Sequence, residues 1–182
     1  MVEQADSTGE GGGGETLEAE VSRRLREAGL SLALAESVTG GLIASRLVGV
    51  PGASNFLRAG YVAYSHESKR RDLGVSAEIL ESHGAVSGPV ATAMAEGARR
   101  RAGADLGLAT TGEAGPEPFE ALAGTVFVAL SWKGDIRTEA LVARGDREAI
   151  RSQASEAALD LLRRRLIGEI RSREASDRPP LP

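Results

Sequence analysis

Short apolar runs alternate along the chain with longer stretches in which apolar residues recur every three or four positions. The short runs predict β-strands at 30–34, 56–64, 105–111, 124–132 and 136–142. The longer stretches predict helices at 17–28, 41–48, 65–71, 77–82, 88–102 and 147–168. Because helices and strands alternate, and a hairpin joins the last two strands, we expect an α/β fold with three layers around a mixed sheet.

The two ends of the chain lack this periodicity. Residues 1–14 are mostly glycine and polar residues, and residues 169–182 are rich in charge and proline. Such segments bury too little apolar surface to offset the entropy that is lost on ordering. We therefore expect a disordered tail at 1–14, one domain at 15–168 and a loose C-terminal tail at 169–182.

Composition narrows the functional classes. The chain has 182 residues, 41% of them hydrophobic and 26% charged, which is typical of one globular domain. A net charge of -4 argues against a nucleic-acid-binding surface. No apolar run approaches the roughly 20 residues of a membrane span, and the acidic, glycine-rich start differs from a signal peptide. We expect a cytoplasmic protein with no nucleic-acid or membrane partner.

Residue usage also limits the chemistry. The chain has no cysteine, which excludes disulfides, thiolate catalysis and cysteine metal sites, and its two histidines are not spaced as a local ligand pair. We therefore expect neither a metal site nor histidine-based catalysis. Among the 22 basic residues only Lys69 and Lys133 are lysines. Lysine, unlike arginine, can lose its proton and act as a base. The alternative is that a lysine occurs at position 69 by chance.

The segment 35–41, Ala-Glu-Ser-Val-Thr-Gly-Gly, joins the first predicted strand to the second predicted helix. A strand, a hydroxyl-and-glycine turn and a helix place side-chain oxygens beside backbone N–H groups. These N–H groups lie at the positive end of the helix dipole, where an anion or a developing oxyanion is stabilised. A structural explanation is also open, in which Ser37 or Thr39 caps the helix while Gly40 and Gly41 make the turn.

Three loops that follow predicted strands carry candidate catalytic residues. If these strands are parallel, their loops meet at one edge of the sheet, where open α/β sheets bind ligands. The residues that would meet there are Ser37, Thr39, Tyr64, Lys69 and Thr111. A desolvated lysine can take the proton of a serine hydroxyl while a phenol relays or orients it, so this set can activate a nucleophile without histidine. The alternatives are that Tyr64 is a half-buried strand end and Lys69 a surface helix residue.

The segment 35–41 resembles the Ala-Glu-Ser-Cys-Thr-Gly-Gly motif of the CinA C-terminal domain family, the nicotinamide mononucleotide (NMN) deamidases. Further matches occur in the family's order, and together they cover residues 17–166. They lie at 50–54, 64–69, 73–75, 83–87, 111–112, 114–116, 124–126 and 145–147. The resemblance implies a three-layer α/β/α sandwich that hydrolyses the carboxamide of NMN to nicotinate mononucleotide and ammonia. It also implies no metal or organic cofactor, and a homodimer or larger homo-oligomer.

The resemblance implies roles for individual residues as well. The family's catalytic serine, tyrosine and lysine fall on Ser37, Tyr64 and Lys69, and the arginine of its Gly-Asp-Arg motif falls on Arg147. Ser37 would attack the amide carbon with Lys69 as base and Tyr64 assisting proton transfer, while Arg147 would bind the phosphate. Further residues expected to bind substrate, the first three through backbone N–H groups, are Thr39, Gly40, Gly41, Thr111 and Gly112.

The chain departs from the family pattern in two places. Val38 stands where the motif has cysteine. In the third loop, Glu113, the segment 117–120 (Glu-Pro-Phe-Glu) and the segment 121–123 replace an apolar residue, glycines and Lys-Pro-Val. A lysine is lost and three carboxylates are gained, and each like charge about 4 Å from a phosphate costs roughly 1 kcal/mol in water. The loop therefore supports an alternative function, a catalytically degenerate member that serves as a nucleotide-binding or interaction module.

Overall fold

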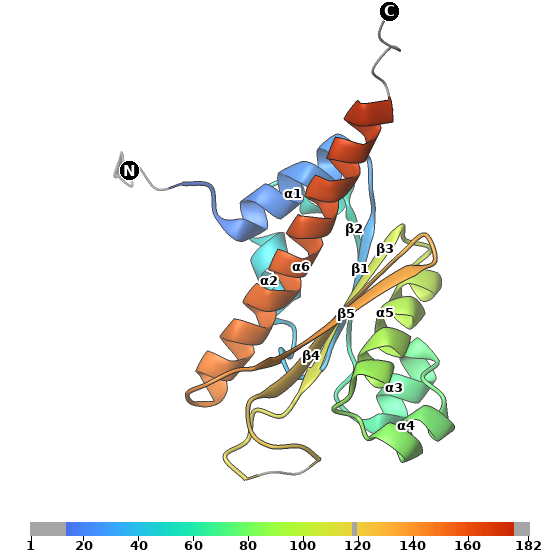
Figure 1. Cartoon of the computed structure of the whole chain (residues 1–182), viewed down its shortest axis with the longest axis vertical. Helices are drawn as coiled ribbons and strands as arrows, with labels where there is room; N and C mark the ends of the chain where they lie inside the picture. The colour runs from blue at the N-terminus through green and yellow to red at the C-terminus, as the bar shows by residue number, and fades with distance from the viewer. Residues whose placement is uncertain (1–13, 118–119, 177–182) are drawn as a thin grey trace, which may run out of the picture.

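The computed structural model describes residues 14–117 and 120–176, so residues 1–13 of the predicted N-terminal tail lie outside it. The chain forms one sheet with helices on both faces (Figure 1), which confirms the predicted three-layer α/β class. In chain order the elements are α1 (Leu17–Ala28), β1 (Leu32–Glu36), α2 (Leu42–Val48), the 3-10 helix η1 (Ala53–Asn55), β2 (Leu57–Val62), α3 (His66–Leu73), α4 (Ala77–His83), α5 (Gly88–Ala102), β3 (Leu106–Gly112), β4 (Thr125–Trp132), β5 (Asp135–Val142) and α6 (Arg147–Ser176).

The sheet is mixed, as predicted. Its strand order is β2-β1-β3-β4-β5, and β1 is parallel to both of its neighbours. By contrast, β4 and β5 form an antiparallel hairpin beside β3. Because β1, β2 and β3 are parallel, the loops that follow them leave the same edge of the sheet. The candidate catalytic residues were predicted to meet at this edge.

Two apolar cores fill the space on either side of the sheet. Helices α1, α2 and α6 cover one face, and α3, α4 and α5 cover the other (Figure 1). Successive residues of β1 alternate between the cores, so that Leu32 faces the first and Ala33 the second. A Cβ at Gly107 would lie 2.0 Å from the carbonyl oxygen of Ala95. Small residues on this face therefore let α5 pack directly on the sheet.

The helix ends follow the expected caps except at the C-terminus. Ser65, Ser76 and Ser87 each accept a backbone N–H at the start of a helix. The last helix, α6, continues to Ser176, so the predicted loose tail at 169–182 is helical over its first part. Residues 169–176 contain neither glycine nor proline, and nothing in them interrupts the helix; residues 177–182 lie outside the described ranges. No described helix, α6 included, is long and apolar enough to cross a membrane.

Candidate active site

A buried carboxylate holds the turn that follows β1. Glu36 is only 1% exposed. It accepts hydrogen bonds of 2.8 to 3.0 Å from the backbone N–H groups of Gly41, Ile43 and Ala44. A carboxylate at this position complements the positive end of the α2 dipole. Ser37 follows directly, and its own N–H donates to the carbonyl oxygen of Thr110 at 3.0 Å.

Two of the three N–H groups expected to bind an anion, those of Gly40 and Gly41, are used within this turn. The N–H of Gly41 is bonded to the buried carboxylate, and that of Gly40 donates to the carbonyl oxygen of Ser37 at 3.1 Å. Both glycines have positive φ angles, 61° and 95°, so they make the turn. Thr39 is fully buried, with its hydroxyl 2.8 Å from that of Thr110. The N–H groups of Gly40 and Gly41 are therefore not free in this structure, and their part in substrate binding stays a prediction.

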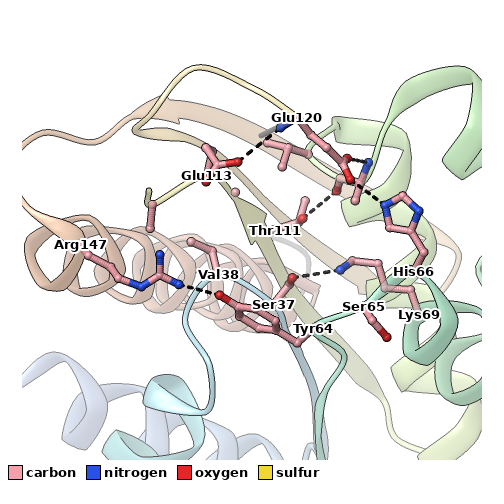
Figure 2. Close-up of a pocket in the computed structure, with 14 residues that line it drawn as sticks. Ser37, Val38, Tyr64, Ser65, His66, Lys69, Thr111, Glu113, Glu120 and Arg147 are labelled. Atoms are coloured by element: carbon pink, nitrogen blue, oxygen red, sulfur yellow. Dashed lines mark hydrogen bonds and ion pairs between the residues drawn. The ribbon is translucent and has the colours of Figure 1, made fainter. Parts of the chain in front are cut away.

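Lys69 is a buried side chain next to the candidate nucleophile. Its Nζ lies 3.0 Å from the Oγ of Ser37 and 3.0 Å from the carbonyl oxygen of Ala63, and the residue is 2% exposed (Figure 2). Burial lowers the pKa of Lys69 from 10.5 to about 8, while the charge of Glu120 acts in the opposite direction. Near this pH a large fraction is neutral amine, which can accept a hydroxyl proton. Lys69 is thus no surface helix residue.

The start of α3 delivers this lysine to the sheet edge. Ser65 and Ser68 form a reciprocal capping box, in which each hydroxyl accepts the other residue's backbone N–H, at 3.1 and 3.0 Å. Lys69 comes next, and its N–H donates to the carbonyl oxygen of Ser65 at 3.0 Å. Helical side chains lean toward the N-terminus of their helix. A long side chain in the first turn of α3 therefore reaches back to the end of β1.

Tyr64 and Arg147 form a second polar pair at the mouth of the site. The Nη2 of Arg147 donates to the Oη of Tyr64 at 2.6 Å, and Tyr64 is 59% exposed. Figure 2 shows this pair on the side of Ser37 away from Lys69. Within the described chain, no hydrogen bond joins the phenol of Tyr64 to Ser37 or to Lys69. The phenol consequently orients a guanidinium, a group suited to binding phosphate or carboxylate.

These side chains surround one cavity of about 500 Å³, within the size range of small-molecule sites. Its lining includes six of the predicted site residues, namely Ser37, Tyr64, Lys69, Thr111, Gly112 and Arg147. The hydroxyl of Thr111 donates to the carbonyl oxygen of Ala85 at 2.7 Å, and a Cβ at Gly112 would lie 2.8 Å from the carbonyl oxygen of Thr125. These two residues therefore shape the wall of the cavity and hold β3 against its neighbours.

The acidic loop after β3 contributes two carboxylates to the cavity wall. Glu113 accepts backbone N–H groups from Gly115, at 3.1 Å, and from Glu120, at 3.5 Å. Glu120 in turn lies 2.7 Å from the Nε2 of His66 and also accepts the N–H of Ala85. Glu113, Glu120 and His66 line the cavity. Both carboxylates therefore take part in the local hydrogen bonding of this wall.

Glu36 and His66 were not among the residues predicted for the site. For Glu36 a signal was present, because an acidic residue shortly before a helix start can reach forward to the helix N–H groups. For His66 there was none, because its partner Glu120 lies 54 positions further along the chain.

The fold and the site define a class of protein. It is an α/β domain with a serine hydroxyl beside a buried amine, a guanidinium at the mouth of the cavity, and no group of three or more His, Asp or Glu placed for a metal among the described residues. A serine hydroxyl beside a buried amine, with a guanidinium nearby, suits nucleophilic attack on a small anionic molecule. The sequence model of the CinA C-terminal domain matches residues 14–166, and the chain belongs to that family.

Relatives and solved structures agree with this membership. The chain is 48% identical over 159 residues to the CinA-like protein of Geobacter metallireducens, covering 86% of this chain and 38% of that protein. It is 51% identical over 157 residues to the CinA-like protein of Syntrophotalea carbinolica, covering 85% of this chain and 38% of that protein. The chain thus spans well under half the length of these relatives.

Among solved structures, a CinA superfamily protein from Klebsiella pneumoniae superposes with a TM-score of 0.81 at 39% identity, covering 84% of this chain and 96% of that chain. A CinA superfamily protein from Escherichia coli gives a TM-score of 0.78 at 39% identity, covering 89% of this chain and 94% of that chain. At these identities and coverages the shared fold extends over nearly all of the described domain.

Proposed function

We propose that this domain is an amidohydrolase that converts NMN to nicotinate mononucleotide and ammonia. The observation that supports this function best is the 3.0 Å contact between the Nζ of Lys69 and the Oγ of Ser37 in the wall of one cavity. A serine hydroxyl is a weak nucleophile until a neighbouring base accepts its proton. Lysine can be that base only where burial lowers its pKa, as it does here.

The reaction follows from this pair in two halves. Neutral Lys69 takes the Ser37 hydroxyl proton as Oγ attacks the carboxamide carbon, and the negative charge moves to the amide oxygen. When the tetrahedral intermediate collapses, the C–N bond breaks, and Lys69 returns the proton to the departing ammonia. Water then attacks the acyl-serine with Lys69 again as base, which releases the carboxylate and restores Ser37.

The oxyanion needs a donor other than the N–H groups of the turn glycines. Val38 directly follows Ser37 and lines the cavity, and its N–H has no hydrogen-bond acceptor in the described part of the chain. A backbone N–H beside the nucleophile is a suitable donor for a developing oxyanion. The phosphate of NMN would lie at the mouth, where Tyr64 orients the guanidinium of Arg147.

Ammonia release from NMN by the purified protein tests the proposal, with Ser37→Ala and Lys69→Met as blanks. We expect turnover well above both blanks. The value of kcat/KM should rise tenfold per pH unit up to about 8, the pKa of Lys69, and level off above it. Release of ammonia no faster than from Ser37→Ala would overturn the function.

The acidic wall favours one second candidate, a nucleotide-binding module without turnover. Glu113 and Glu120 bring to the cavity two carboxylates that the family's motif lacks, so the wall departs from the catalytic pattern while the cavity itself is kept. Calorimetric titration with NMN separates the two functions. Tight binding without ammonia release favours the module, whereas binding accompanied by release favours the enzyme.

A further inference from the structure

Glu120 occupies a distinctive position in the cavity wall. Its side chain is 20% exposed and lies 2.7 Å from the Nε2 of His66. Its second oxygen accepts the backbone N–H of Ala85, in the segment between α4 and α5. Figure 2 shows this carboxylate above Lys69, with His66 beside it. Two independent elements thus hold the carboxylate in one place.

The charge of Glu120 acts on the candidate base. Burial favours the neutral amine of Lys69, and the negative charge of Glu120 favours the protonated ammonium. Other titratable or charged side chains of the same cavity are Tyr64, His66, Glu113 and Arg147. His66 is bonded directly to Glu120. Arg147 is bonded to Tyr64, on the opposite side of Ser37.

We propose that Glu120 is a positioning residue for the Ser37–Lys69 pair, holding a fixed negative charge beside the lysine through its contacts with His66 and Ala85. This role rests on the proposed function for its effect on catalysis, but its electrostatic part can be measured without any substrate. The residue touches neither reacting atom. It acts through the protonation of the base, keeping more of the lysine as ammonium at a given pH than burial alone would.

Removing the charge therefore has a defined sign. In Glu120→Gln the side chain keeps its length and an oxygen that can accept the N–H of Ala85, but it loses its charge. Lys69 should then release its proton at a lower pH. Because Glu120 is partly exposed and its charge is partly screened, we expect a shift of a few tenths of a pH unit.

An NMR titration of the full chain, labelled with ¹³C-lysine, measures this shift directly. Lys69 and Lys133 are the chain's only lysines, so two Cε signals are expected, and Lys133→Arg assigns them. The matched control is Glu117→Gln, which removes a carboxylate from the same loop at a residue that does not line the cavity. Glu120→Asp keeps the charge and should titrate close to the wild type.

The expected result is a downward shift of the Lys69 titration in Glu120→Gln and no shift in Glu117→Gln. An unchanged or raised midpoint in a folded Glu120→Gln protein would overturn the proposal. If NMN is turned over, the acid limb of kcat/KM should move by the same amount as the NMR midpoint. If NMN is not turned over, the amidohydrolase function fails while the NMR shift still decides the role of Glu120.

Discussion

Two loops face the same cavity and are built differently. The turn at 37–41 follows β1, carries the candidate nucleophile and is held by the buried carboxylate of Glu36. The loop after β3 is longer, and its carboxylates Glu113 and Glu120 make their hydrogen bonds close to the surface. Ser37 therefore lies in the segment of the site that buried hydrogen bonds hold most firmly. The loop after β3, which forms the opposite wall, can change its side chains with less effect on the stability of the fold.

The difference has a physical origin. A buried carboxylate that accepts three N–H groups at a helix start makes charge-assisted bonds that water cannot replace. Carboxylates near the surface make weaker bonds because water and salt screen them. The departures of this chain from its family's motifs also follow this division, since the turn has one apolar replacement whereas the loop has gained three carboxylates.

The largest expected effect lies in the turn. Ser37→Ala should reduce kcat/KM for ammonia release from NMN by at least about a thousandfold, because no nucleophile remains. Glu113→Gln, in the other loop, should lose no more than about tenfold, since it changes a wall and leaves the reacting groups intact. If the loop variant lost as much activity as the turn variant, the division between the two regions would not hold.

Lys69 links the two regions, and its pKa predicts a change of stability with pH. The folded value of about 8 lies below the unfolded value of 10.5, so the unfolded chain binds more protons between these pH values. The free energy of unfolding should therefore rise through this window by about 3 kcal/mol because of Lys69. Denaturant unfolding of wild type and Lys69→Met, below and above the window, measures this contribution. Equal pH dependence in the two proteins would contradict it.

Glu36 tests how firmly the turn is held. Glu36→Ala leaves three buried or part-buried N–H groups without their acceptor, and we expect a loss of about 3 kcal/mol in the free energy of unfolding. Glu36→Gln keeps one carbonyl oxygen as an acceptor and should lose less. Denaturant unfolding at constant pH gives both values. A loss below about 1 kcal/mol for the alanine variant would show that water or neighbouring groups replace the carboxylate.

The smallest effect is expected in the loop. Glu113→Ala removes an acceptor of two backbone N–H groups that lie nearer the solvent. Water can take over those bonds, so the loss in the free energy of unfolding should stay below about 1 kcal/mol. The same unfolding series measures it beside Glu36→Ala. A loss as large as that of the turn variant would remove the proposed contrast.

Much of the architecture could be predicted because it depends on local pattern. Serines at 65, 76 and 87 mark helix starts, and the apolar periods mark the strands, since capping and periodicity involve residues that are near one another in sequence. The meeting of Ser37 and Lys69 followed from one further assumption, that β1 and β2 are parallel. The end of α6 was predicted less well, because charged residues fit a helix as readily as a tail.

The order of helices and strands, the family and the residues able to carry chemistry can all be read from the sequence. How those residues are used follows from the folded structure alone. It buried Lys69, bonded Glu36 to the helix N-terminus, paired Tyr64 with Arg147 and placed Glu120 in the wall of the cavity that Lys69 also lines. The contacts of Lys69, Tyr64 and Glu120 join residues that are far apart along the chain, and Lys69 is also buried. Local pattern carries little information about either, because desolvation and charge act through space.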